Sequence, residues 1–244
     1  MSLSGFGDTG AAQPPPALFP APEPEAPAPG SVRRRSGAGV PSSPPPQTDD
    51  AGRQLVFFGA EAAEPTVADL AGLLAGPGEV VRMGGTARLS VRVDAAWRVH
   101  VLVAELALRG LAASWEPTGD ERHAVRTSYT RVLKPLAVAW LHGTAKRPPA
   151  TFHLTGRRLR LWLAAAGTPE PSGGFLLRLG EGDRECWEPI GAALAAAGLE
   201  GTMTGPDDGG PGYLISGRRR LGRLAELVGE PPRAAPADAW PTRP

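Results

Sequence analysis

Cysteine and lysine are almost absent from this 244-residue chain, which contains one cysteine, Cys186, and two lysines. A single cysteine excludes a disulfide framework, and it also excludes a structural zinc site clamped by pairs of cysteines. The four histidines lie apart and lack the HExxH spacing of a hydrolytic zinc site. The chain has neither a GxSxG nucleophile elbow nor a glycine-rich loop that leads into a GK[ST] helix. The sequence thus carries no motif of a zinc hydrolase, an α/β-hydrolase or a P-loop NTPase.

Long apolar runs are missing as well. No apolar stretch reaches the ~20 residues that a transmembrane helix needs. Residues 1–8 lack the basic region and the apolar run of an export signal. We therefore expect a cytoplasmic protein that does not associate with a membrane. The scarcity of lysine beside abundant alanine, glycine, proline and arginine is typical of a GC-rich, bacterial genome.

The net charge of +1 conceals an uneven distribution. Residues 82–160 hold 14 basic and five acidic side chains, whereas residues 161–232 hold six basic and ten acidic ones. The near-neutral total is therefore an average, and it does not exclude a nucleic-acid partner. We expect DNA or an acidic partner to favour the first of these two regions.

Proline is concentrated at the N-terminus, where residues 1–50 contain 12 of the 28 prolines. Such a segment has too few aliphatic side chains to offset the entropy lost on ordering. We expect disordered tails over residues 1–53 and over residues 231–244, the second of which begins with Pro231 and Pro232.

The segment between the tails shows one order of elements twice. The first copy is expected to hold a helix over 66–76, a hairpin over 79–93, a helix over 97–111, a hairpin over 114–130 and a helix over 133–142. The second copy is expected to hold a helix over 156–166, strands over 175–180, 200–204 and 213–216, and helices over 185–198 and 220–228. Internal repetition of this kind predicts an α+β domain with a pseudo-two-fold axis, built from two αββαββα repeats over 54–146 and 147–230.

Two segments resemble the LAGLIDADG motif of homing endonucleases, namely residues 70–80 and residues 159–167. In that family the two motif helices pack against each other at the pseudo-two-fold axis. The small residues that would allow this close approach here are Ala71, Gly72, Ala164 and Ala165. The resemblance implies one saddle-shaped domain that binds DNA with the concave face of its sheets.

The same resemblance includes a departure at the catalytic position. The last acidic residue of the motif, which holds the catalytic divalent metal in the family, corresponds here to Pro77 and Ala166. Neither side chain can ligate a metal, because hard cations such as Mg²⁺ need oxygen ligands such as carboxylates. We therefore expect a protein that is not an enzyme, with no catalytic residues, no metal site and no small-molecule cofactor.

A closer resemblance is to the N-terminal domain of WhiA-type proteins, which are bacterial regulators with a degenerate LAGLIDADG domain. The order and spacing of residues 157–179, 192–198, 213–216 and 224–229 follow the second repeat of that domain. WhiA-type proteins also carry a C-terminal helix-turn-helix, and here only a proline-rich segment follows Gly229. The resemblance implies a DNA-binding or transcription-regulatory protein, and promoter recognition through a helix-turn-helix is not implied.

The candidate binding residues are arginines on the predicted sheets. Strand 86–93 alternates strictly, so Arg88 and Arg92 lie on the face opposite its apolar residues. The full candidate set is Arg82, Arg88, Arg92, Arg122, Arg126 and Arg178. Arginines on such a face can bind the phosphates of duplex DNA bidentately. An ordinary solvated sheet face, or a surface that docks a transcription-related protein without DNA, would show the same pattern.

Overall fold

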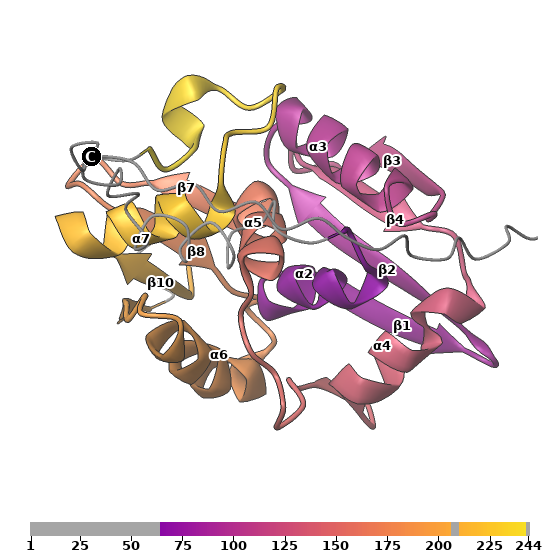
Figure 1. Cartoon of the computed structure of the whole chain (residues 1–244). Helices are drawn as coiled ribbons and strands as arrows, with labels where there is room; N and C mark the ends of the chain where they lie inside the picture. The colour runs from indigo at the N-terminus through magenta and orange to yellow at the C-terminus, as the bar shows by residue number, and fades with distance from the viewer. Residues whose placement is uncertain (1–63, 206–209, 243–244) are drawn as a thin grey trace, which may run out of the picture. The chain divides into compact units, whose positions relative to one another are not determined.

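The computed structural model describes residues 64–205 and 210–242 (Figure 1). The predicted N-terminal tail and the start of the first predicted repeat lie outside these residues. The described elements fall into two successive sets, each built around a four-stranded antiparallel sheet.

The first set contains nine elements. They are η1 (Val67–Leu70), α2 (Ala71–Ala75), β1 (Glu79–Met83), β2 (Thr86–Val93), α3 (Ala96–Ala107), β3 (Ala113–Pro117), β4 (His123–Thr127), η2 (Arg131–Leu133) and α4 (Lys134–Trp140). The strands are ordered β1-β2-β4-β3. Strand β2 alternates as expected, because its apolar residues are buried under the helices while the residues between them are more exposed.

The second set follows a short hairpin of β5 (Leu141–His142) and β6 (Ala145–Lys146). It contains α5 (Gly156–Ala166), β7 (Gly167–Pro169), β8 (Phe175–Arg178), α6 (Arg184–Ala196), β9 (Thr202–Thr204), β10 (Gly212–Ile215), α7 (Arg218–Val228) and η4 (Ala237–Ala239). Its sheet has the order β7-β8-β10-β9, which matches the first sheet strand for strand. The predicted duplicated α+β fold is therefore confirmed, with the addition of β7, a strand that the sequence did not predict.

Helices α2 and α5, the two motif helices, pack side by side between the sheets (Figure 1). A Cβ atom at Gly72 would lie 1.8 Å from the carbonyl oxygen of Arg158, so only glycine permits this backbone contact. A Cβ atom at Gly76 would lie 2.4 Å from the ring of Trp162, whose side chain is fully buried. The predicted capping box forms at the start of this motif, since the backbone N–H of Thr66 donates to Asp69 at 2.7 Å.

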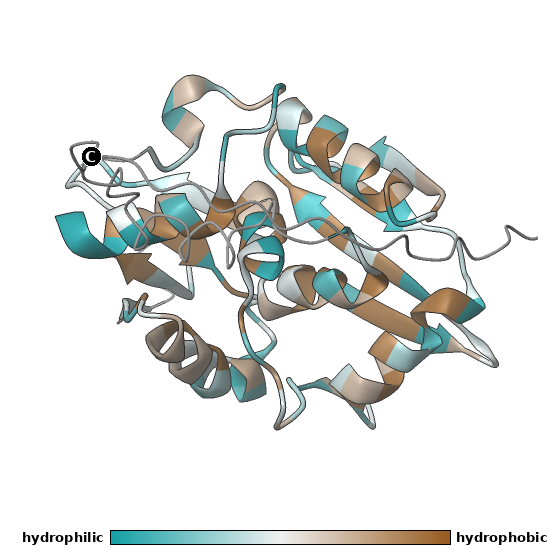
Figure 2. Cartoon of the chain, viewed as in Figure 1, coloured by the Kyte–Doolittle hydropathy of each residue, from teal (hydrophilic) through white to brown (hydrophobic). Residues whose placement is uncertain are grey.

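Apolar residues line the contacts between each sheet and its helices. Figure 2 shows hydrophobic residues along β2 and α5 and hydrophilic residues at one end of α7. Among the helices of residues 64–205 and 210–242, none is both long enough and apolar enough to cross a membrane.

The C-terminal segment differs from the prediction of a disordered tail. Residues 231–242 pack against the second set, and Trp240 is 2% exposed. The indole N–H of Trp240 donates to the carbonyl of Gly229 at 2.9 Å, and the guanidinium of Arg160 lies 5.1 Å from the centre of the Trp240 ring. The prediction was wrong here because it counted prolines and overlooked how much apolar surface one tryptophan buries.

The contact between the motif helices is open to a direct test. Gly72→Ala places a methyl group against the backbone of Arg158, so we expect it to lower the free energy of unfolding by about 3 kcal/mol. The control is Gly85→Ala in the β1–β2 turn, where an added Cβ meets nothing within 4 Å. Urea denaturation of both variants measures the difference, and equal stability of the two would contradict the proposed contact.

Candidate nucleic-acid interface

A groove of about 720 Å³ runs between the two sheets, beside the C-terminal ends of α2 and α5. Pro77, Ala165 and Ala166 line it where the motif helices end. Five of the six predicted arginines also line it, namely Arg88, Arg92, Arg122, Arg126 and Arg178. The structure thus brings residues from both sheets to one surface.

Strand register determines which side chains face this groove. Arg126 lies opposite Ser90, and Ala124 lies opposite Arg92, so the arginines of β2 and β4 share one face. Arg82 lies opposite Ala87, whose side chain is fully buried on the other face of the sheet. The expectation that Arg82 joins Arg88 and Arg92 was therefore wrong.

Most of the groove arginines on the first sheet already have carboxylate partners. Arg92 lies 4.0 Å from Glu79, and Arg122 lies 3.6 Å from Asp120. Arg126 pairs with Glu116 on β3. These pairs are exposed to solvent, so each contributes little to stability and can exchange its partner for a phosphate at small cost.

Asp120 remains charged at neutral pH. The hydroxyl of Thr118 donates to its carboxylate, and this bond together with nearby Arg122 holds the pKa of Asp120 below its usual value. The Arg122 guanidinium therefore faces a fully ionised partner near the rim of the groove.

The second sheet contributes a different set of charges. Within the described lining of the groove it supplies one cation, Arg178, beside the carboxylates of Glu181 and Asp183. The four arginines of the first sheet thus face a wall on which carboxylates outnumber cations. This agrees with the uneven charge distribution in the sequence.

Buried cations bind the carbonyls at the C-terminal ends of both motif helices. Lys146 donates to Gly76 at 2.9 Å and to Gly78 at 2.7 Å, just after α2. Arg98 donates to the carbonyls at the end of α5, those of Leu163, Ala164 and Gly167. Both cations counter the partial negative charge that a helix carries at its C-terminus.

An aspartate at the groove holds each of these cations. Arg98 Nε lies 2.8 Å from Asp94, and Lys146 Nζ lies 2.6 Å from Asp183. The two aspartates occupy equivalent places, each on the segment that leads from an inner strand into α3 or α6. Burial lowers the pKa of Arg98, and Asp94 acts against this shift. None of these four residues was predicted from the sequence, although the i,i+4 spacing of Asp94 and Arg98 could have indicated that pair. The other contacts join residues that are distant in the chain.

The helix ends do not fit a divalent metal ion. Pro77 and Ala166 supply no oxygen from their side chains, and carbonyls nearby are bonded to Lys146 and Arg98. Across residues 64–205 and 210–242, no group of three or more His, Cys, Asp and Glu side chains is arranged to hold a metal ion.

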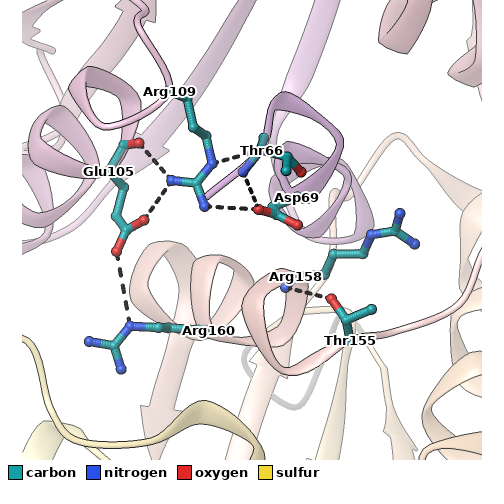
Figure 3. Close-up of polar contacts among 7 residues, drawn as sticks. All are labelled: Thr66, Asp69, Glu105, Arg109, Thr155, Arg158 and Arg160. Carbon is teal, nitrogen blue, oxygen red and sulfur yellow. Dashed lines mark hydrogen bonds and ion pairs between the residues drawn. The ribbon is translucent and has the colours of Figure 1, made fainter. Parts of the chain in front are cut away.

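A second polar network joins the other ends of the motif helices (Figure 3). Arg109 is almost completely buried, and it contacts Glu105 at 2.6 Å and Asp69 at 3.4 Å. Arg160 on α5 reaches the other oxygen of Glu105 at 4.0 Å. Within this network the sequence predicted the capping box of Thr66 and Asp69, and the i,i+4 spacing of Glu105 and Arg109 could have indicated one further pair.

Two solved structures of homing endonucleases resemble the chain. The homing endonuclease I-WcaI, bound to its DNA recognition sequence, gives a TM-score of 0.52 at 11% identity, over 75% of this chain and 88% of that one. Variants of the homing endonuclease I-DmoI give a TM-score of 0.38 at 14% identity, over 66% of this chain and 93% of that one. The chain has a homing-endonuclease-like fold. Neither a protein-family model nor a curated protein matches it.

The homing-endonuclease-like fold corrects one expectation. The sequence led us to expect a protein that is not an enzyme, but I-WcaI is an endonuclease and therefore an enzyme. The assignment as a non-enzyme was wrong. A likeness at 11% identity establishes the fold, and catalysis by this chain does not follow from it.

The buried cations give a prediction about stability. Arg98→Met leaves three carbonyls and Asp94 without their cation, so we expect a loss of about 3 kcal/mol in the free energy of unfolding. The control is Arg220→Met, which removes an exposed pair with Glu200 and is expected to cost at most about 0.5 kcal/mol. Thermal and urea unfolding of the two variants provide the measurement. A cost for Arg98→Met no larger than the control would show that the cation does not stabilise the helix end.

Cys186 provides a chemical probe of the same region. Its thiol donates to the carbonyl of Lys146 at 3.2 Å, and burial raises its pKa to about 11. At pH 8 only about one thiol in a thousand is then ionised, and the thiolate is the reactive form. We expect native protein to react slowly with an alkylating reagent, with a rate that continues to rise above pH 9, whereas unfolded protein reacts rapidly. A native rate that levels off near pH 8.5 would contradict this.

Proposed function

We propose that the protein binds duplex DNA along the groove, chiefly through the arginines of the first sheet. In this proposal it acts in transcription regulation as a cytoplasmic, WhiA-like protein of a GC-rich bacterium. The observation that carries the proposal is the convergence of five arginines from two sheets on one groove.

The chemistry of these side chains supports a phosphate partner. Arginine presents two parallel N–H groups that match the oxygens of a phosphate, and its charge does not titrate in the physiological range. Arg92, Arg122 and Arg126 lie in exposed ion pairs, which a polyanion can displace. The resemblance in fold to an endonuclease that was solved with its DNA agrees with this partner.

A protein-docking module is the alternative function. Two exposed apolar side chains, those of Val81 and Met83, lie on β1 and point to the same face as Arg88, with exposed fractions of 43% and 58%. Such residues suit a protein partner better than a phosphate backbone. Docking of another regulator on this face would require no contact with DNA.

A salt series with the full chain tests the proposal. We expect affinity for duplex DNA to fall linearly with the logarithm of salt concentration, because phosphate contacts release counterions. Arg92→Ala combined with Arg126→Ala is expected to weaken binding to all sequences and to reduce the slope by about two. Fluorescence anisotropy with a labelled duplex measures both quantities.

The matched control also removes two positive charges, but from a surface outside the groove. Arg218 and Arg219 are exposed in the first turn of α7 and do not line the groove, so replacing both by alanine should leave the slope nearly unchanged. Equal effects of the two double variants would indicate attraction by net charge alone. An absence of binding at low salt would refute DNA binding and favour the docking alternative.

A further inference from the structure

Arg88 differs from the other groove arginines of the first sheet. Arg92, Arg122 and Arg126 each pair with a carboxylate. Within residues 64–205 and 210–242, the guanidinium of Arg88 has no hydrogen bond or ion pair, and it lies instead over the ring of Tyr129 at 4.9 Å from the ring centre. An aromatic ring beneath a guanidinium fixes the plane of the guanidinium and leaves its N–H groups free to donate within that plane.

A β-bulge places Tyr129 beneath Arg88. Strand β2 pairs Ser90 with Arg126, but its next contact joins Ala87 to Thr130, so the partner segment holds one extra residue. Two backbone hydrogen bonds, of 3.0 and 2.9 Å, hold Ala87 to Thr130. In this shifted register Arg88 comes opposite Tyr129.

The bulge is stabilised from within. The backbone N–H of Leu89, which the shift removes from the regular ladder, donates instead to the hydroxyl of Thr127 at 3.0 Å. Thr127 is 3% exposed, so this bond is protected from water. Tyr129 lies just after β4, and its segment is held to β2 by the Ala87–Thr130 bridge on one side and by the Leu89–Thr127 hydrogen bond on the other.

The orientation of Arg88 leaves the terminal N–H groups of its guanidinium available to a ligand. Its Nε is buried and has no partner, whereas the terminal nitrogens make no hydrogen bond among the described residues and are not buried. A ligand in the groove can therefore approach only end-on, between the two terminal N–H groups. This geometry matches two acceptors that lie side by side in one plane.

We propose that Arg88, held by Tyr129, reads a guanine in the major groove of duplex DNA. This proposal rests on the proposed function. Guanine presents O6 and N7 together at the major-groove edge, and arginine binds them bidentately. A fixed fork without an acidic partner suits a planar base edge, whereas the paired arginines around it suit phosphates. Tyr129 is a positioning residue, since it acts through Arg88.

Selection of binding sites from a randomised duplex pool tests the proposal with the full chain. The unchanged protein is expected to select sites with one fixed G·C pair, whose replacement lowers affinity about tenfold. Arg88→Lys keeps the charge but loses the bidentate fork, and it should remove the preference at that position alone, with the salt slope preserved. Tyr129→Phe should keep the preference, and Tyr129→Leu should weaken it.

Arg82→Lys is the matched control, because Arg82 lies on the opposite face of the same sheet and should leave the selected sites unchanged. Circular dichroism and thermal unfolding confirm that each variant is folded. Binding without any change of base preference in Arg88→Lys, or equal loss of affinity for all sequences, overturns the guanine contact and leaves DNA binding intact. An absence of DNA binding by the unchanged protein overturns the proposed function and this proposal with it.

Discussion

The backbone contact between α2 and α5 is the constraint on which the rest of the structure depends. Gly72 touches the carbonyl of Arg158, and no side chain fits between them. The two helices run in the same direction, with Gly72 beside Arg158 and Gly76 beside Trp162, so their C-terminal carbonyls collect at one end of the contact. Two sheets that extend from such a helix pair border one groove, and the helix ends lie beside it.

Close helix ends create an electrostatic problem that the buried cations resolve. Each helix brings about half a negative charge to its C-terminus, next to a surface where a polyanion is proposed to bind. Lys146 and Arg98 occupy these ends, so the carbonyls point at cations and not at the groove. Each cation comes from outside the helix that it caps, and it holds the capped helix to other parts of the chain. The same contacts therefore support both stability and the charge of the groove.

Local patterns in the sequence predicted the elements whose causes are local. The alternation of strand 86–93 placed Arg88 and Arg92 correctly, and the spacing of Thr66 and Asp69 identified a real capping box. Arg82 was misplaced because the register was not followed through the two-residue turn of Gly84 and Gly85, which sets Met83 opposite Thr86 and therefore Arg82 opposite the buried Ala87. Most of the other contacts that the sequence did not predict join residues that are distant along the chain. Lys146 lies 68 residues or more from the carbonyls that it binds, and the bulge beside Tyr129 depends on how two separate segments pair.

Duplication of the fold has not produced duplication of the interface. On the first sheet, the groove face of the inner strands carries Arg88, Arg92 and Arg126. On the second sheet, Leu176 pairs with Leu214 in register with Arg178 and Gly212, so leucines take the places beside the single arginine.

Leu176 is only 3% exposed and is not among the residues that line the groove. An anion that enters the groove therefore meets four arginines on one wall, and on the other wall it meets Arg178 together with the carboxylates of Glu181 and Asp183. A DNA duplex bound in this groove would be held asymmetrically, with its backbone against the first sheet, even though the two halves of the protein share one topology.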